Sequence, residues 1–281
     1  MSSQSLRPAP SETVNRIQAN LITHYRMFAG LPGVSFTETD ITWSIDTQGI
    51  PGNQILHTQV PDAEIDQRID ELLREIGQIA SQVDWFVFPS CQPADLGERL
   101  AARGQAGGPD GAWRLIGKIG GPGGNWMLTD LTALASAPAV ATNFHVESVD
   151  NPHMLDQWRQ ISAAGFGGGD FQTFYAAYAR HGFGKDACSL HHIGYLDDTP
   201  VTSSTLLLAD GIAGLFDIST PPAWRRQGFG SAISWAMLQA AQTRGYRDAY
   251  VWSSALGKGV YAGIGFVAAD IGMREYQWQK R

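Results

Sequence analysis

A strand, a basic turn with two glycines and a long helix are the elements that residues 212–244 predict, in that order. The apolar run 212–218 leads through two prolines into the turn, and an amphipathic segment with helical spacing follows from Ser231. The backbone N–H groups at the start of such a helix have no partner within it, and the helix dipole adds positive charge there. Gly228 and Gly230 carry no side chain that would hold a ligand away. The segment therefore predicts a binding site for a phosphate group.

The spacing of the glycines excludes two common phosphate-binding motifs. A dinucleotide fingerprint needs a third glycine at position 233, which is isoleucine here. A P-loop needs Gly-Lys-Ser or Gly-Lys-Thr, and the sequence contains neither tripeptide. The pattern that fits is Arg/Gln-x-x-Gly-x-Gly/Ala, which is filled by Arg225, Gly228 and Gly230.

This pattern resembles the acyl-CoA-binding motif of the GNAT N-acetyltransferase superfamily, and its neighbours follow in the order of that family. An Asp-Gly turn signal at 210–211 predicts a hairpin before the motif. A β-rich run, 249–253, follows the helix, and the segment from Tyr261 to Phe266 resembles the family's Tyr-x-x-x-Gly-Phe ending. Residues up to Trp278 would supply the last strand. The resemblance covers roughly half of the chain, from residue 139 to the end.

The resemblance implies an α/β (α+β) fold, with a mixed, mostly antiparallel twisted sheet flanked by helices. At 281 residues the chain is longer than one ordinary domain, so two domains are expected. The N-terminal half repeats the order of long helix, aromatic strand and short helix, over 62–83, 85–88 and 96–103. We therefore expect two GNAT-like domains in tandem, a degenerate one at 1–136 and an acyl-CoA-binding one at 137–281. An unrelated α/β architecture would give a similar faint repeat.

The resemblance also implies which residues hold the co-substrate, acetyl-CoA. The turn and the helix start would bind its pyrophosphate, and the end of the preceding strand would pair with its pantetheine arm. Where the superfamily often has an asparagine, seven residues before the tyrosine, this chain has a serine. The expected contacts are Ile218, Ser219, Thr220, Arg225, Arg226, Gln227, Gly228, Phe229, Gly230, Ser231 and Ser254.

Acetyl transfer to an amine needs a base for the amine and an acid for the leaving thiolate. By resemblance Tyr261 would be the acid, and packing of a helix against the sheet is its alternative role. Asp217 is the first candidate base, since a carboxylate in a cleft can have a raised pKa, and alternation places it on the face of Leu215 and Ser219. A structural hydrogen-bond acceptor is its alternative role. His192 is the second candidate, because a neutral imidazole is available near pH 7.

Composition narrows the range of partners. The net charge of −7 argues against nucleic-acid binding, whereas the excess of bases after residue 200 suits a polyanionic co-substrate. No apolar run approaches the roughly 20 residues of a membrane span, and the polar N-terminus predicts no signal peptide, so a cytoplasmic protein without membrane contact is expected. Cys91 and Cys188 lie far apart in the sequence, and His191 and His192 would point to opposite faces of a strand, so no metal site is expected.

These observations together predict an acetyl-CoA-dependent N-acetyltransferase that acts on the primary amine of a small molecule, as a monomer or a homodimer. One alternative is an acyltransferase that uses another donor. Another is a non-catalytic module that senses acyl-CoA. No local motif identifies the amine, although the resemblance implies that the helical region 153–180 lines its pocket.

Overall fold

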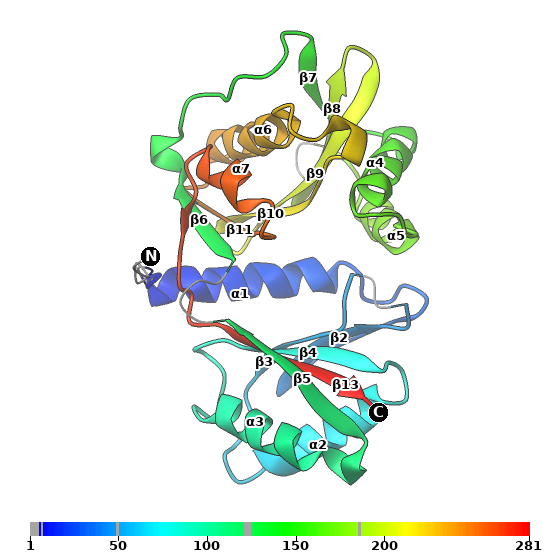
Figure 1. Ribbon diagram of the computed structural model, residues 1–281, viewed down its shortest axis with the longest axis vertical. Coiled ribbons are helices and arrows are strands. Elements are labelled where there is room, and N and C mark those ends of the chain that lie inside the picture. The colour runs from blue at the N-terminus through cyan, green and yellow to red at the C-terminus, as the bar shows by residue number, and fades with distance from the viewer. Residues whose placement is uncertain (1–5, 7, 49–50, 121–124, 185–186) are drawn as a thin grey trace. The chain divides into compact units, whose positions relative to one another are not determined.

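The chain forms two compact units in the computed structural model (Figure 1). Unit 1 consists of residues 1–124 and 270–281, and unit 2 of residues 125–269. Each unit contains one mixed, mostly antiparallel sheet flanked by helices, which confirms the expected α/β (α+β) class. The structure describes residues 6, 8–48, 51–120, 125–184 and 187–281.

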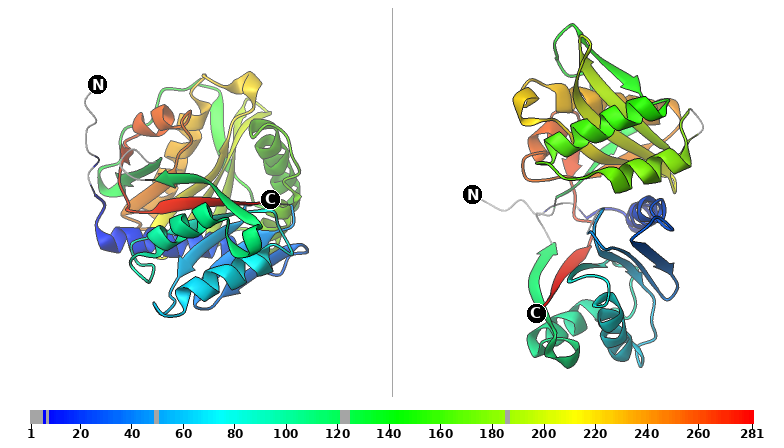
Figure 2. Two further views of the ribbon diagram at one scale, coloured as in Figure 1. Left: turned by 60° about the horizontal axis from the view of Figure 1, so that its bottom comes forward. Right: turned by 90° about the vertical axis from the view of Figure 1, so that its right-hand side faces the viewer.

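Unit 2 has a seven-stranded sheet in the order β12-β6-β11-β10-β9-β8-β7. Its strands β10 and β11 are parallel, and its other neighbouring strands are antiparallel. Two helices, α4 and α5, lie side by side on one face of this sheet (Figure 2). The elements are β6 (Trp126–Asp130), β7 (Phe144–Ser148), α4 (Pro152–Gly165), α5 (Gln172–His181), β8 (Ser189–Leu196), β9 (Thr199–Ala209), β10 (Ile212–Ser219), α6 (Phe229–Thr243), β11 (Asp248–Trp252), α7 (Lys258–Ala262) and β12 (Val267–Ala268).

Unit 1 repeats this plan with a six-stranded sheet in the order β1-β2-β3-β4-β13-β5. One pair, β3 and β4, is parallel, and the other pairs are antiparallel. The elements are α1 (Ser11–Arg26), β1 (Val34–Glu38), β2 (Ile41–Asp46), β3 (Gln54–Thr58), α2 (Ile65–Ile76), β4 (Gln82–Val87), α3 (Leu96–Ala106), β5 (Trp113–Gly120) and β13 (Arg274–Lys280).

Each sheet takes one strand from the other half of the chain. β6 is the next strand after β5 in sequence, yet it pairs with β11 and β12 in unit 2. β13 ends the chain, yet it pairs with β4 and β5 in unit 1. The sequence-based boundary between residues 136 and 137 therefore differs from the observed division, and the strand that contains Trp278 does not complete the second sheet. Alternation along a strand reveals its buried face but not the sheet that it joins.

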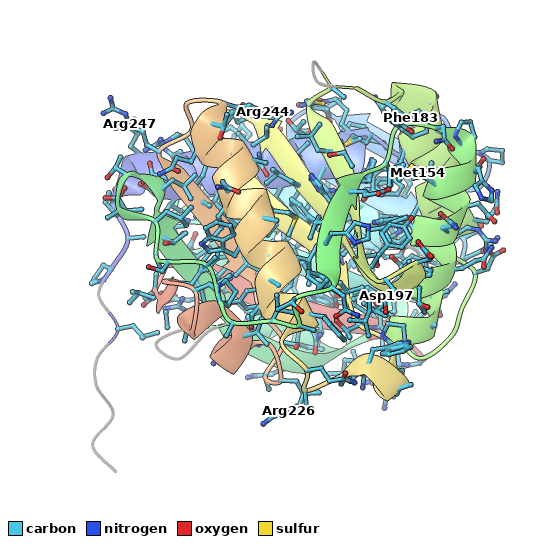
Figure 3. The ribbon with its side chains drawn as sticks, turned by 90° about the horizontal axis from the view of Figure 1, so that it is seen from above. Met154, Phe183, Asp197, Arg226, Arg244 and Arg247 are labelled. Atoms are coloured by element: carbon cyan, nitrogen blue, oxygen red, sulfur yellow. The ribbon has the colours of Figure 1, made fainter. Side chains whose placement is uncertain are left out.

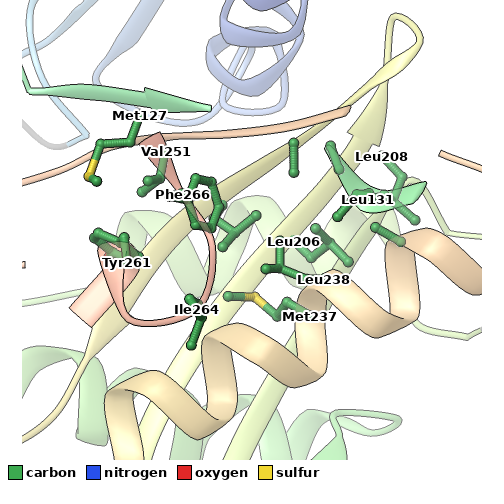
Figure 4. Packing of buried hydrophobic residues seen from close by; sticks show 14 of the residues in the cluster. Met127, Leu131, Leu206, Leu208, Met237, Leu238, Val251, Tyr261, Ile264 and Phe266 are labelled. Atoms are coloured by element: carbon green, nitrogen blue, oxygen red, sulfur yellow. The ribbon is translucent and has the colours of Figure 1, made fainter. Parts of the chain in front are cut away.

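The core of unit 2 lies between α6 and the sheet (Figure 4). Met237 and Leu238 of α6 pack in one cluster, the α6 cluster, with Leu206 of β9 and Leu215 of β10. Since burial of apolar area stabilises roughly in proportion to the area removed from water, this cluster fixes α6 on the sheet. The turn at the start of α6 is thereby held next to the end of β10.

Truncation of a buried side chain on β13 tests the strand exchange. Trp278 is fully buried, so Trp278→Ala should lower the free energy of unfolding of unit 1 by about 3–5 kcal/mol. Hydrogen-exchange mass spectrometry should show faster exchange in β4 and β5, the neighbours of β13, with β9 to β11 unchanged. Leu256→Ala is the control, because this side chain is 88% exposed and its removal should cost less than about 0.5 kcal/mol. An equal loss of protection in β10 and β11 would contradict the exchange.

Candidate active site

The turn between β10 and α6 leaves the start of α6 open. Gly228 is the N-cap residue with φ +88°, and no side chain of a described residue caps the helix. The first helical hydrogen bond runs from Ala232 N to Gly228 O, at 3.0 Å. The N–H groups of residues 229–231 therefore precede the ladder of helical bonds, and the first turn carries no acidic side chain. Such a helix start offers hydrogen-bond donors and positive charge to an anion.

The two arginines of the turn have different surroundings. The side chain of Arg225 folds back, where Nε donates to Thr220 O at 2.9 Å and Nη2 donates to Gly165 O at 2.7 Å. It therefore ties the turn to the end of β10 and to the end of α4. Arg226 is exposed, with φ +64°, and its side chain extends away from the fold (Figure 3). Arg225 thus positions the turn, whereas Arg226 presents its charge to solvent.

The neighbouring residues fix the helix start and keep its surface accessible. Phe229 is buried, and its ring stacks on Phe144 with centroids 5.1 Å apart, so it offers the turn only its backbone. A Cβ added at Gly230 would lie 3.7 Å from Thr220 Oγ1, which is an ordinary contact, so space is open there. The other sequence-predicted contacts near the turn are Gln227, whose Nε2 donates to Ala223 O at 3.4 Å, and Ser231, which is partly buried.

β10 and β11 cease to pair next to this turn. Their parallel pairing runs from Ala213 opposite Ala249 to Leu215 opposite Val251. Beyond it the register of β10 against β9 shifts between Phe216 and Ser219. Parallel strands whose pairing ends inside a sheet present backbone groups to a ligand between them.

Side chains hold the end of β10 after the register shift. Ser219 Oγ donates to the carbonyl groups of Ile161 and Ser162 in α4, at 3.3 Å each. Thr220 Oγ1 lies 3.0 Å from Thr202 Oγ1. Ile218 packs against the α6 cluster. The carbonyl groups of Ser219 and Thr220 accept hydrogen bonds from Thr202 Oγ1 at 2.7 Å and from Arg225 Nε at 2.9 Å. Residues 218–220, at the end of β10 and just after it, border the place where the strands separate.

Ser254 belongs to the loop after β11. Its Oγ accepts a hydrogen bond from Gly257 N at 3.2 Å, and its carbonyl accepts a bond from Ser253 Oγ at 2.7 Å. Ser254 therefore shapes the turn before α7. Its side chain is exposed, and its expected contact with the co-substrate stays a prediction.

In unit 1 the backbone itself closes the position that corresponds to the separation of β10 and β11 in unit 2. Beyond the short pairing of β3 with β4, Gln92 N donates to Thr58 O at 2.9 Å, and Val60 N donates to Gln92 O at 3.4 Å. The helix that follows, α2, has Glu64 at its N-cap and Asp66 in its first turn. Their negative charges would repel a phosphate group. Unit 1 therefore keeps the sheet of unit 2 but has neither the strand separation nor the charge for an anionic ligand.

Asp217 lies in a network of polar side chains between the sheet and α5. Tyr178 Oη donates to Asp217 Oδ2 at 2.6 Å, and Thr205 also bonds to this carboxyl group. Thr205 Oγ1 lies 3.0 Å from His191 Nδ1, and His191 Nε2 lies 3.2 Å from Ser189 Oγ. Burial raises the pKa of Asp217 to about 6, although the two hydrogen bonds oppose the rise. A carboxyl group that titrates near neutral pH is suited to general-base catalysis.

Asp217 shares a face of the sheet with Ser219, as expected, but not with Leu215. Leu215 packs in the α6 cluster, whereas Asp217 and Ser219 face α5 and α4 on the other side of the sheet. Asp217 has φ +50°, and the register shift interrupts the alternation at this point. A β-bulge adds one residue to a strand and so turns the following side chains to the opposite face.

His192 does not join this network. It neighbours His191 on β8 and so points to the other face, where burial and the charge of Arg244 lower its pKa to about 4. Its Nδ1 has no hydrogen-bond partner within the described part of the chain. The two candidate bases, Asp217 and His192, are therefore not brought together. His191 contacts the Asp217 network instead, and only the cross-strand register, which places it opposite Thr205, could have shown this.

Tyr261 of α7 is part of the α6 cluster (Figure 4). The side chain is 7% exposed, and its ring meets Phe266 edge to face with centroids 5.7 Å apart. Burial raises the pKa of the phenol, which therefore stays protonated at neutral pH. The residue packs a helix against the sheet and also retains a proton that it could donate.

A series of aromatic rings leads from the surface to Tyr178. Phe166, which is 54% exposed, stacks on Phe171 with centroids 5.5 Å apart. Phe171 stacks on Phe174 at 5.0 Å, and Trp158 meets Tyr178 edge to face at 5.3 Å. Tyr178 holds the Asp217 carboxylate at the end of this series. The helical region 153–180 thus contains a layer of packed aromatic rings, exposed at Phe166 and buried at Trp158 and Tyr178, that ends at a candidate base.

No group of three or more His, Cys, Asp or Glu side chains among the described residues is placed to hold a metal ion. None of the described helices is both long and apolar enough to cross a membrane.

Solved structures are similar to the whole chain in fold. A GCN5-related N-acetyltransferase from Kribbella flavida matches with a TM-score of 0.66 and 12% identity, over 94% of this chain and 94% of that chain. A tandem GNAT protein from the clavulanic acid biosynthesis pathway matches with a TM-score of 0.59 and 12% identity, over 97% of each chain. A GCN5-related N-acetyltransferase from Sphaerobacter thermophilus gives 0.55 and 13%, over 98% of this chain and 94% of that chain. No family model and no curated protein matches the sequence. The likenesses confirm the expected tandem GNAT fold.

Replacement of Asp217 should alter the pH dependence of stability. The pKa of this carboxyl group rises from 3.8 to about 6 on folding. Its contribution to stability is therefore complete below about pH 4 and is lost as the pH rises through 6. Asp217→Asn has no such group, so its melting temperature relative to the wild type should increase between pH 4 and pH 7 in thermal unfolding followed by circular dichroism. Asp198→Asn, an exposed carboxyl group of unit 2, is the control. A constant difference for Asp217→Asn would contradict the raised pKa.

Proposed function

We propose that unit 2 binds acetyl-CoA at the turn before α6 and transfers its acetyl group to the primary amine of a small molecule. The observation that carries the proposal is the contrast between the two units. In unit 2 the start of α6 has no side-chain cap from a described residue, and it adjoins the place where β10 and β11 cease to pair. In unit 1 the same position is filled by backbone bonds of Gln92 and lined by acidic residues. The similar solved structures that are named N-acetyltransferases support the proposal.

The parts of acetyl-CoA find matching groups on unit 2. The N–H groups of residues 229–231 and the guanidinium group of Arg226 would hold the pyrophosphate. Arg225 would act indirectly, because both of its recorded hydrogen bonds hold the turn in place. The backbone of 218–220 would pair with the amide groups of pantetheine. The thioester would then lie where β10 and β11 separate.

The proposed reaction uses Asp217 as the base and Tyr261 as the acid. Asp217, directly or through a water molecule, takes a proton from the ammonium group of the acceptor. The amine nitrogen attacks the thioester carbonyl carbon, the C–S bond breaks, and the thiolate of CoA takes the phenolic proton of Tyr261. The second proton that the nitrogen loses as it becomes an amide passes through water to the phenolate of Tyr261, and Asp217 releases its proton to solvent. The products are the N-acetylated amine and CoA. The hydrogen bond from Tyr178 holds the carboxylate of Asp217 in position.

Two alternatives make different predictions for the same site. An acyltransferase with a longer donor would bind acyl-CoA at the same turn but prefer a larger acyl group. A non-catalytic sensor would bind acyl-CoA without releasing CoA.

Both cysteines are free thiols, which is compatible with the reducing cytoplasm in which we place the enzyme.

Charge reversal in the turn tests CoA binding. Arg226→Glu replaces an attractive charge by a repulsive one, so the affinity for CoA measured by calorimetry should fall by roughly tenfold or more. Gly230→Trp should abolish binding, because an indole would occupy the space beside the helix start. Arg247→Glu is the matched control, since Arg247 lies beyond the other end of α6 (Figure 3). Wild-type protein that does not bind CoA at all would refute the proposal.

Substitutions of the two catalytic candidates separate an enzyme from a sensor. With acetyl-CoA and a panel of primary amines, release of the CoA thiol is followed by a colorimetric reagent. Tyr261→Phe should lower kcat by roughly 10²–10⁴-fold at unchanged CoA affinity, as expected for loss of a general acid. Asp217→Asn should remove the rise of kcat/KM with pH near 6. CoA binding without thiol release for any amine would favour the sensor.

A further inference from the structure

A chain of polar side chains leads away from Asp217 along one face of the sheet of unit 2. The carboxyl group accepts hydrogen bonds from Tyr178 Oη, at 2.6 Å, and from Thr205. Thr205 Oγ1 lies 3.0 Å from Nδ1 of His191, and Nε2 of His191 lies 3.2 Å from Ser189 Oγ. Thr205 and His191 are directly opposite each other on β9 and β8. The chain therefore connects the candidate base with both nitrogen atoms of an imidazole ring two strands away.

The members of this chain are shielded from water. Thr205 is fully buried, and the exposed fractions of His191 and Ser189 are 2% and 4%. The ring of His191 packs against the ring of Tyr178, with centroids 4.0 Å apart, and meets Trp158 of α4 edge to face at 5.6 Å. Buried polar groups take their hydrogen-bond partners from the protein, and His191 has a hydroxyl group at each of its two ring nitrogens. The packing thus holds the imidazole in the orientation that continues the chain.

The number of protons in the chain decides the direction of each hydrogen bond. A hydroxyl group has one proton, and a neutral imidazole carries a proton on only one of its two nitrogens. If Nδ1 of His191 lacks the proton, the hydroxyl group of Thr205 must donate to it, and Asp217 loses this donor. If Nδ1 carries the proton, it donates to Thr205 Oγ1, and the proton of Thr205 is left for the carboxylate. The hydroxyl group of Ser189 then donates to Nε2.

The charge of Asp217 favours the second arrangement. A carboxylate can only accept hydrogen bonds, and those that it accepts are roughly twice as strong as bonds between neutral groups. Thr205 also lies within bonding range of the oxygen of Tyr178, but that phenol is neutral and gives its own proton to Asp217. Hydrogen bonds in a chain polarise one another, so each donor is expected to point toward the negative charge.

We propose that His191 is a positioning residue for the candidate base: its Nδ1–H group donates to Thr205 Oγ1 and so directs the hydroxyl proton of Thr205 to the carboxylate of Asp217. No proton leaves His191 in this role. The bond from Thr205 stabilises the ionised carboxylate and opposes the effect of burial, which raises the pKa of Asp217 to about 6. His191 thereby helps to set the pH above which Asp217 accepts a proton. Its effect on catalysis rests on the proposed function, whereas its effect on the carboxyl group does not.

The neighbouring elements bring two phenols close to Asp217. Tyr178 of α5 donates to its carboxyl group. Tyr250 of β11 meets Phe216, the residue before Asp217, edge to face with centroids 6.1 Å apart. The pKa of Asp217 is set by burial and by the hydrogen bonds from Tyr178 and Thr205. As long as the bond from Tyr178 is kept, the titration of Asp217 therefore reports the bond from Thr205.

Nitrogen-15 NMR of the wild-type protein tests the direction of the chain. At a pH well above the pKa of Asp217, the chemical shifts of the two imidazole nitrogens of His191 show which of them carries the proton. The signals are identified by their absence from His191→Asn. We expect the proton on Nδ1, and a proton on Nε2 would overturn the proposal. This measurement needs no variant to fold like the wild type, apart from the one used for identification.

Carbon-13 NMR of the Asp217 carboxyl group tests the effect on the candidate base in the free protein. His191→Leu removes the Nδ1–H donor and Thr205→Val removes the hydroxyl group, so each should raise the pKa of Asp217 by about half a pH unit or more. If both act through one hydrogen bond, the double variant should show no larger rise than Thr205→Val alone. His191→Asn and Thr205→Ser keep a donor in the same place and should titrate like the wild type.

The control for this titration is His153→Leu, which removes an exposed histidine of α4 and should leave Asp217 unchanged. Circular dichroism checks the folding of each variant. Wild-type titration of Asp217 in a folded His191→Leu, or an equal rise in His191→Asn, would show that the imidazole only fills space.

The pH profile of acetyl transfer separates this inference from the proposed function. Where CoA thiol is released, the acidic limb of kcat/KM should move to higher pH in His191→Leu and return in His191→Asn. A fall of kcat/KM by the same factor at every pH would contradict the positioning role. If no amine gives thiol release, the proposed function fails, and the titration of Asp217 still decides the role of His191.

Discussion

The left-handed backbone at Asp217 is the constraint on which the candidate active site depends. A non-glycine residue with φ +50° is strained, so the surrounding contacts must hold it. The bond from Tyr178 and the anchoring of Ser219 on α4 do so. The resulting register shift directs a carboxyl group toward α5, and it follows the last parallel pair of β10 and β11. One local distortion thus supplies both a candidate base and the strand end next to the phosphate-binding turn.

Part of this arrangement could be predicted from the sequence because it depends on local chemistry. The start of α6 follows from Gly228, the prolines before it and the apolar spacing after it, and each acts within a few residues. The apolar run 212–218 likewise predicted the strand that is observed as β10. The face of Asp217 could not be predicted, since the bulge depends on contacts with α4 and α5. The choice between His191 and His192 required the register against β9, which no periodicity reports.

The domain boundary is a result of long-range strand pairing. β6 and β13 have ordinary strand sequences, and each pairs with strands from the other half of the chain. Because each strand is flanked on both sides in its sheet, neither half of the chain can complete its own sheet.

The two units share one sheet plan, but they place different charges beside the positive end of the helix that follows the parallel strand. In unit 1 the start of α2 is surrounded by the protein's own carboxylates, and Asp62 and Asp66 form ion pairs with Arg99 of α3. Exposed ion pairs of this kind contribute little individually, but they join α2 to α3 and offset the positive end of the helix dipole. In unit 2 the start of α6 has no acidic side chain, and Arg226 adds positive charge beside it. The charge of an external anion is therefore most stabilising at α6, which supports the proposed acyl-CoA site in unit 2.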